Sequence, residues 1–207
     1  MSEPTKNQKV TRRQQQKDET RRLIQDAAYN LFEEKGYHAA TMRELALRAG
    51  VGLGTIFKHF PDKPSLLAAT FVEDVGAVID EALVSVPETD IISQLVHVVR
   101  SLYQFYAQRP SLSQVLCKEA FFLSGAGGQM IEALTVSLLH RVSGLIVSAV
   151  DREELSAELN INDATMAFWA FYSAGLGIGL RTGTFDVGTC AEMVKRLLTQ
   201  YLQSPKK

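Results

Sequence analysis

Cysteine is scarce in this sequence, and so are long apolar runs. The 207 residues contain two cysteines, Cys117 and Cys190, which are too few and too far apart to predict a disulfide framework or a metal knuckle. No uninterrupted apolar run reaches the roughly 18 residues that a membrane span needs. The polar, basic N-terminus also lacks the apolar segment of a secretory signal. We therefore expect a protein of the reducing cytoplasm, with no membrane partner.

Sequence patterns of familiar catalytic sites are missing as well. The motifs G-x-S-x-G and H-E-x-x-H are absent, and His, Cys, Asp and Glu do not cluster at metal-ligand spacing. Gly175, Gly177 and Gly179 follow a G-x-G-x-G pattern that no strand precedes, so they do not predict a nucleotide site. These absences predict no catalytic residues, no metal, no cofactor, and a protein that is not an enzyme.

The net charge of −1 hides an uneven distribution of charge. Residues 1–63 carry 12 Lys and Arg against 8 Asp and Glu, whereas residues 64–207 carry 10 against 15. The positive excess lies in residues 1–22, where 7 basic residues stand against 3 acidic ones. A basic end on an acidic body favours polyanion binding at that end. The alternative is a solvated, disordered leader, because residues 1–17 have too few apolar side chains to order themselves.

Apolar residues recur with the period of an α-helix along the rest of the chain, and no segment alternates as a strand does. A helical stripe begins at Asp18, and Gly36 ends that helix. Beyond the Pro61-Asp62 break we expect helices at 63–84, 90–108, 111–123, 127–152, 163–181 and 187–203. The sequence therefore predicts an all-α protein with three parts: a disordered basic leader (1–17), a helix-turn-helix domain (18–62) and a helical body (63–207).

Two short helices joined by a turn occupy residues 41–60. Thr41-Met42-Arg43-Glu44 has the spacing of a capping box, which starts the first of them. Gly50-Val51-Gly52 forms the turn, and Gly50 can adopt the positive φ that such a turn requires. The second short helix runs from about Leu53 to His59 or Phe60. This arrangement predicts a helix-turn-helix, whose second helix enters the major groove of DNA.

The string RLIQDAAYNLFEEKGYHAATMRELALRAGVGLGTIFKHFPDKPSLL, from Arg22 to Leu67, resembles the DNA-binding region of the tetracycline-repressor (TetR) family. The resemblance rests on AAYNLFEEKGY, Thr41, RELALRAGV, Gly54-Thr55-Ile56-Phe57 and His59-Phe60-Pro-Asp-Lys63. It implies an N-terminal helix-turn-helix domain followed by a helical ligand-binding and dimerisation domain. It also implies a homodimeric transcriptional regulator, and most often a repressor, that binds a palindromic operator in double-stranded DNA.

The resemblance implies specific DNA contacts. Thr41 matches a phosphate contact and Arg43 a position that often reaches DNA, while Gly54 and Thr55 match positions that meet base edges or adjacent phosphates. The complete implied set is Thr41, Arg43, Gly54, Thr55, Phe57, Lys58, His59 and Lys63, with Lys63 matching a phosphate-binding lysine. Three positions depart from the family pattern, because Gly52 replaces a usual Ser, Leu53 a usual polar residue and Phe57 a usual Tyr.

Aromatic side chains are concentrated in the helical body, where the resemblance implies a ligand pocket. The candidates for its walls are Tyr103, Phe105, Tyr106, Phe121, Phe122, Met130, Phe168, Trp169 and Tyr172. Candidate polar anchors are His97, His140, Arg100 and Glu119. Such a composition suits a small hydrophobic effector. The alternative for each aromatic residue is a place in the ordinary core.

The glycines at 175, 177 and 179 interrupt a predicted helix, and each destabilises a helix interior by about 1 kcal/mol relative to Ala. Close backbone packing should compensate. A dimer interface formed by helices 163–181 and 187–203 is the natural candidate for that packing, and packing within the chain is the alternative. A flexible leader can supply further contacts to the DNA backbone or the minor groove. Its basic side chains are Lys6, Lys9, Arg12, Arg13 and Lys17.

Three functions remain open at this stage. The first is a ligand-responsive repressor, in which an effector changes the spacing of two recognition helices. The second is an effector-independent DNA-binding factor of the same fold, acting in chromosome organisation or division. The third is a small-molecule-binding protein or enzyme with a vestigial DNA-binding end.

Overall fold

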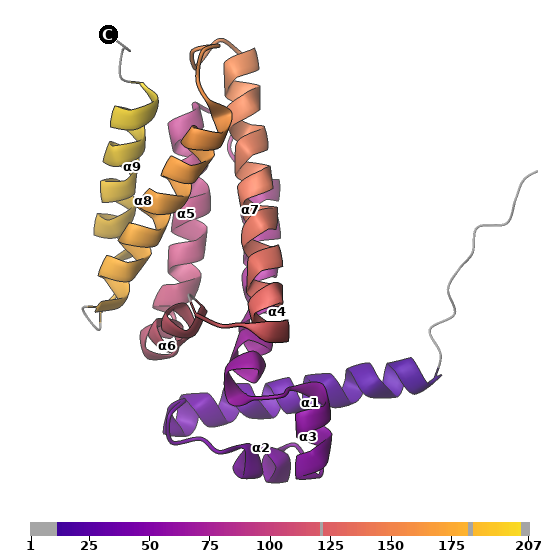
Figure 1. The fold of residues 1–207 in the computed structure, drawn as a ribbon. Helices are drawn as coiled ribbons and strands as arrows, with labels where there is room; N and C mark the ends of the chain where they lie inside the picture. Colours follow the sequence, from indigo (N-terminus) through magenta and orange to yellow (C-terminus); the bar gives the residue numbers. More distant parts are fainter. Residues whose placement is uncertain (1–11, 121, 182–183, 204–207) are drawn as a thin grey trace, which may run out of the picture. The chain divides into compact units, whose positions relative to one another are not determined.

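The computed structural model describes residues 12–120, 122–181 and 184–203, and within these ranges every regular element is an α-helix, as predicted (Figure 1). The helices, in chain order, are α1 (Arg12–Lys35), α2 (Met42–Arg48), α3 (Leu53–His59), α4 (Lys63–Val84), α5 (Ile91–Ala107), α6 (Pro110–Ala120), α7 (Gly125–Asp151), α8 (Ile161–Arg181) and α9 (Val187–Leu202). From α4 onward, each end lies within three residues of the predicted end.

The chain divides into two compact units, one up to Leu66 and the other from Leu67 onward. The predicted boundary between residues 62 and 63 falls at the first residue of α4, slightly before this division. In the first unit, α2 packs on α1 and α3 packs on α2. The shared core consists of Ile24, Leu31, Phe32, Leu45, Ile56 and Phe60, none of which is more than 2% exposed.

The start of α1 differs from the prediction. The helix begins at Arg12 rather than at Asp18, so residues 12–17 of the predicted disordered leader are helical. These first turns bury no apolar side chain, but Gln, Lys and Arg have good helix propensity. The Gln14 amide also donates to Asp18 one turn later, at 2.9 Å. Residues 1–11 of the predicted leader, including Lys6 and Lys9, lie outside the described residues.

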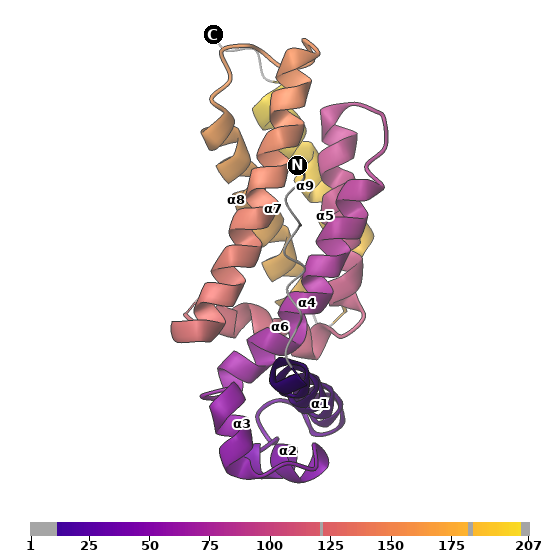
Figure 2. The ribbon, with the colours of Figure 1, turned by 90° about the vertical axis from the view of Figure 1, so that its right-hand side faces the viewer.

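In the second unit, α8 lies beside α9 and α7, and α5 packs against α9, as Figures 1 and 2 both show. The short α6 packs against α8 and α5. Asp90 caps α5 by accepting from the Ser93 amide at 2.9 Å, and Asp186 caps α9 through the Thr189 amide at 3.0 Å. These helices enclose a core in which Leu102, Phe168 and Val194 are fully buried.

One of the described helices, α7, is long and apolar enough by composition to cross a bilayer, with a mean hydropathy of 1.6 over an 18-residue window. Only 22% of that window is buried within the chain. Arg141 of this helix forms an ion pair with Asp80 of α4. A core helix of a soluble protein passes the same test, so the finding is weak support for a membrane span.

Candidate nucleic-acid interface and ligand cavity

The turn between α2 and α3 has a defined hydrogen-bond pattern. Gly50 adopts a φ of +66°, and its amide donates to the Leu47 carbonyl at 3.2 Å, while the Val51 amide donates to the Ala46 carbonyl at 3.0 Å. This pair of bonds is a Schellman motif, which requires a left-handed residue at the position that Gly50 occupies. The predicted turn and the predicted role of Gly50 are both confirmed.

A capping box begins α2, as predicted. The Thr41 hydroxyl accepts from the Glu44 amide at 3.2 Å, and the Glu44 carboxylate accepts from the Thr41 amide at 3.1 Å. Lys35 at the end of α1 donates to the same carboxylate at 2.5 Å. The bonds from Lys35 and Thr41 lower the pKa of Glu44. Thr41 is thus exposed and fixed at the surface by its own helix cap.

The solvent-exposed side of α3 consists of Gly54, Phe57 and Lys58. The Phe57 ring is 47% exposed, so it is not a core side chain. Ile56, on the opposite side of the helix, is completely buried and anchors α3 to the unit. Gly52 is the N-cap residue of α3 and makes no side-chain capping bond, as expected from the absence of a hydroxyl there. Thr55, which was predicted to reach DNA, is only partly exposed.

Ion pairs separate the basic side chains of α2, α3 and the end of α1 into two groups. Arg48 forms a bidentate pair with Glu34, at 2.6 and 2.7 Å, and this pair lowers the pKa of Glu34 and raises that of Arg48. Lys35 is similarly held by Glu44. Arg43 and Lys58 are exposed and have no ion-pair partner among the described residues. Arg43 and Lys58 are therefore the cations of α2 and α3 that remain available to an anionic partner.

Further positive charge lies around His59. Burial lowers the pKa of His59, and the positive charges of Lys17, Arg21 and Lys58 lower it further. Its Nδ1 atom is buried without a hydrogen-bond partner among the described residues. The Arg21 guanidinium lies 4.7 Å from the centroid of the Phe60 ring. A neutral His59 thus lies within a basic cluster that α1 and α3 build together.

Lys63, for which the resemblance implied a phosphate contact, donates hydrogen bonds to carbonyl oxygens of its own chain. Its Nζ atom donates to the carbonyl oxygens of Tyr37 at 2.8 Å and Ala40 at 2.9 Å, and lies 3.4 Å from that of His38. The ammonium also lies 4.5 Å from the centroid of the Tyr37 ring. Because carbonyl oxygens already engage its donors, Lys63 holds the segment that leads into Thr41. We propose that Lys63 positions this segment, in place of the phosphate contact that the resemblance implied.

Replacing Lys63 by Met should therefore lower stability more than it alters DNA contacts. Hydrogen bonds to a charged group contribute roughly 1.5–3 kcal/mol, so we expect the free energy of unfolding to fall by about 2 kcal/mol. Urea denaturation followed by circular dichroism measures this change, with Lys58→Met as the exposed control that should shift it by less than about 0.5 kcal/mol. Unchanged stability with a shallower salt dependence of DNA binding would instead make Lys63 a phosphate ligand.

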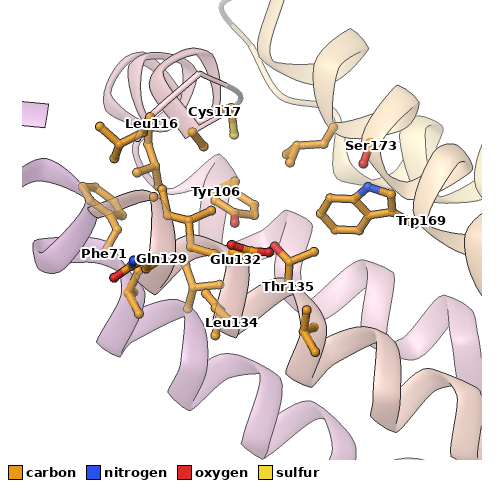
Figure 3. Close-up of a pocket in the computed structure, with 18 of the residues that line it drawn as sticks. Phe71, Tyr106, Leu116, Cys117, Gln129, Glu132, Leu134, Thr135, Trp169 and Ser173 are labelled. Atoms are coloured by element: carbon orange, nitrogen blue, oxygen red, sulfur yellow. The ribbon is translucent and has the colours of Figure 1, made fainter. Parts of the chain in front are cut away.

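A cavity of about 580 Å³ opens among the helices of the second unit (Figure 3). Its walls are mostly apolar and come from α4, α5, α6, α7 and α8. Its lining includes Phe71, Val72, Val75, Tyr106, Leu116, Cys117, Gln129, Glu132, Leu134, Thr135, Trp169, Tyr172, Ser173 and Leu176. Cavities of this size and character are typical small-molecule sites.

The buried polar groups of the cavity are uncharged. Burial raises the pKa of the Tyr106 and Tyr172 phenols. Burial also raises the pKa of the Cys117 thiol to about 12. All three groups keep their protons at neutral pH, so they can exchange hydrogen bonds with a ligand without contributing charge.

Only part of the predicted pocket set lines this cavity. Trp169 and Tyr172 do, together with Tyr106. Tyr103 and Phe168 do not. Tyr103 donates to the Tyr172 carbonyl at 2.6 Å, and Phe168 stacks on the Tyr172 ring.

The other candidates point elsewhere. Phe105 packs edge-on behind Phe71, and Phe122 is 90% exposed. Met130 is absent from the lining, and Phe121 lies outside the described residues. Among the predicted anchors, His97 lies beside Ser85, and Arg100 pairs with Glu192 at 3.7 Å. His140 and Glu119 do not line the cavity either.

Sequence reasoning missed the polar residues of α7 that line the cavity, namely Gln129, Glu132 and Thr135. They recur at intervals of three along one helix, and Glu132 stands between the apolar residues Ile131 and Leu134. An acidic residue within a long apolar helix was the available signal. A single charge on a helix is usually solvated, so this signal is weak.

Two of the three α8 glycines pack within the chain. A Cβ atom on Gly175 would lie 2.3 Å from the Tyr103 hydroxyl, and one on Gly179 would lie 2.2 Å from the Phe185 ring. Gly177 has no atom within 4 Å of that position. Close packing explains Gly175 and Gly179 without a second chain, which corrects the expectation that a dimer contact is their natural role.

Part of this chain is similar in sequence to known bacterial regulatory proteins. A sequence profile described as "Bacterial regulatory proteins, tetR family" matches residues 24–70. The HTH-type transcriptional regulator SAB2452 of Staphylococcus aureus (strain bovine RF122 / ET3-1) is 33% identical over 63 residues. The uncharacterized HTH-type transcriptional regulator YvkB of Bacillus subtilis (strain 168) is 29% identical over 103 residues. These alignments cover 30% and 48% of this chain, but only 34% and 52% of the two curated relatives.

Similarity of fold extends much further along the chain. Thermus thermophilus FadR, described as a TetR family transcriptional repressor and solved in complex with lauroyl-CoA, superposes with a TM-score of 0.73. The superposition covers 90% of this chain and 97% of FadR at 19% sequence identity. At this identity the likeness shows a shared fold and leaves the ligand of this chain open.

Proposed function

We propose, from the premise that this chain belongs to the tetR family of bacterial regulatory proteins, that it is a cytoplasmic, DNA-binding transcriptional repressor. In this proposal two chains form a homodimer on a palindromic operator in double-stranded DNA. A small hydrophobic effector enters the cavity and lowers the affinity for the operator. The protein acts by binding and carries out no catalysis.

The exposed side of α3 is the observation that carries the proposal. The Schellman turn and the buried Ile56 fix this helix, and Gly54 leaves its start open to close approach. Lys58 adds an unpaired cation on that side, and Arg43 adds another on α2. Such a surface fits the major groove, with apolar Phe57 available to pack against a thymine methyl group. Thr41, Thr55 and His59 flank it.

A stripe on α8 supports the homodimer. Met166, Ala170, Ala174 and Ile178 are spaced by four residues and are all exposed. Met166 and Ile178 are 54% and 48% exposed, which is costly for apolar side chains in water. The small residues between them permit close approach of a second helix. A two-fold pairing of this stripe would bury it and set the spacing of two α3 helices.

Selection of binding sites from random double-stranded DNA tests the function directly. We expect an enriched sequence with dyad symmetry, and half-sites separated by about 34–36 Å or a multiple of it. Enrichment of an asymmetric site would contradict the dimeric part of the proposal. Failure to enrich any sequence would contradict sequence-specific regulation.

Replacing Ile178 by Glu should break the homodimer, because the charge would be buried without a partner in the interface. We expect a monomeric mass by light scattering at micromolar concentration and a loss of at least about tenfold in operator affinity. Val84→Glu is the matched control, since Val84 is an equally apolar side chain, 89% exposed, outside the stripe. A dimeric Ile178→Glu variant would place the interface elsewhere.

A further inference from the structure

Glu132 carries the only formal charge among the described residues that line the cavity. The lining includes no Lys, Arg or His. No ion-pair partner of Glu132 occurs among the described residues. The cavity is thus mostly apolar and has a single negative charge that no ion pair among the described residues compensates.

The Glu132 carboxylate is directed into the cavity. Figure 3 shows it on the side of Tyr106 and Thr135, with Trp169 on the opposite wall. Glu132 is exposed, so its charge is accessible to an entering ligand and is not buried when the cavity is empty. This placement avoids the desolvation cost that an enclosed carboxylate would carry.

Aromatic rings surround the same space. Trp169 faces the cavity with its ring 5.5 Å from that of Tyr172, and Phe71 and Tyr106 complete the apolar wall. The faces of such rings attract cations, and the indole of Trp does so best. A carboxylate opposite an indole therefore presents two groups that both favour positive charge.

We propose that the effector is a lipophilic organic cation, with an apolar body and a protonated amine or quaternary onium centre that lies between Glu132 and Trp169. This inference deepens the proposed function and rests on its ligand-binding part. The neutral phenols and thiol at Tyr106, Tyr172 and Cys117 supply no charge that would compete. An acyl-CoA, the type of ligand bound by FadR, would bring several negative charges to a cavity whose described lining offers no cation.

Trp169 is the only tryptophan of the chain, so its fluorescence reports directly on the cavity. The probes are tetraphenylphosphonium and tetraphenylborate, which have nearly the same size and opposite charge, and lauroyl-CoA. We expect tetraphenylphosphonium to quench Trp169 with an affinity at least tenfold higher than that of tetraphenylborate. Glu132→Gln should remove most of this preference, and Glu132→Lys should reverse it. Asp151→Asn on the same helix, outside the cavity, is the control that should leave it unchanged.

Operator binding, measured separately with the full-length chain, distinguishes the two proposals. Preferred binding of tetraphenylborate or lauroyl-CoA would overturn the cation inference. If the preferred anionic probe also released the operator, the proposed function would remain intact. Glu132-dependent binding of tetraphenylphosphonium without any effect on operator affinity would support the cation site and contradict ligand-responsive repression. Absence of binding by all three probes, in a chain that circular dichroism shows to be folded, would overturn the cation inference.

Discussion

A chain in which Arg43 and Lys58 are both replaced by Glu should lose operator affinity by at least about 100-fold, equivalent to about 2.7 kcal/mol. These are the exposed cations of α2 and α3 that have no ion-pair partner among the described residues. Each reversal replaces attraction to a phosphate with repulsion. A homodimer loses four such contacts, so the slope of log affinity against log salt should become shallower by roughly 3 to 4.

The matched control changes the same amount of charge away from α2 and α3. Lys118 and Arg181 are exposed residues of the second unit, and replacing both by Glu alters net charge equally. We expect this control to retain most of its operator affinity. Equal losses in the two double variants would mean that overall charge, rather than the surface of α2 and α3, attracts the DNA. Titrations at several salt concentrations on operator and random DNA supply the measurement.

The helices of this protein are predictable from sequence because their ends carry local signals. Gly36 and Gly50 adopt positive φ values at the places where a helix must stop, and Thr41 with Glu44 forms a cap whose spacing is visible in the sequence. These are interactions between residues at most five apart, so a linear pattern contains them. The start of α1 was missed since nothing at Arg12 marks it: the first turns rest on helix propensity and bury no apolar residue.

The cavity was harder to predict, because it depends on which way each side chain points. Phe168 and Trp169 are adjacent in the sequence, yet Phe168 is fully buried and stacks on Tyr172 while Trp169 lines the cavity. A helical pattern shows that both belong to an apolar region, but it does not show which of the two side chains lines a cavity. Lys63 illustrates the same limit, since the carbonyl oxygens of Tyr37 and Ala40 that engage it are 26 and 23 residues away.

Replacing Gly175 by Ala should destabilise the second unit, although Ala is the better helix former. A Cβ atom there would lie 2.3 Å from the Tyr103 hydroxyl and 3.0 Å from a Val194 methyl group. Tyr103 is fully buried, and its hydroxyl donates to the Tyr172 carbonyl at 2.6 Å, so it cannot move without leaving that bond. An unpaired buried hydroxyl costs about 1–3 kcal/mol, and overpacking costs a similar amount.

The gain in helix propensity, about 1 kcal/mol, offsets only part of this cost, so we expect a net loss of about 2 kcal/mol and a melting temperature lower by about 4–8 °C. Gly144→Ala in α7 is the control, because nothing lies within 4 Å of its added Cβ, and it should be neutral or slightly stabilising. Combining Gly175→Ala with Tyr103→Phe removes the atom that makes the closest contact. The double variant should therefore be more stable than Gly175→Ala alone in thermal and urea denaturation. If the two substitutions instead add as independent losses, the Tyr103 hydroxyl is not what requires glycine at this position.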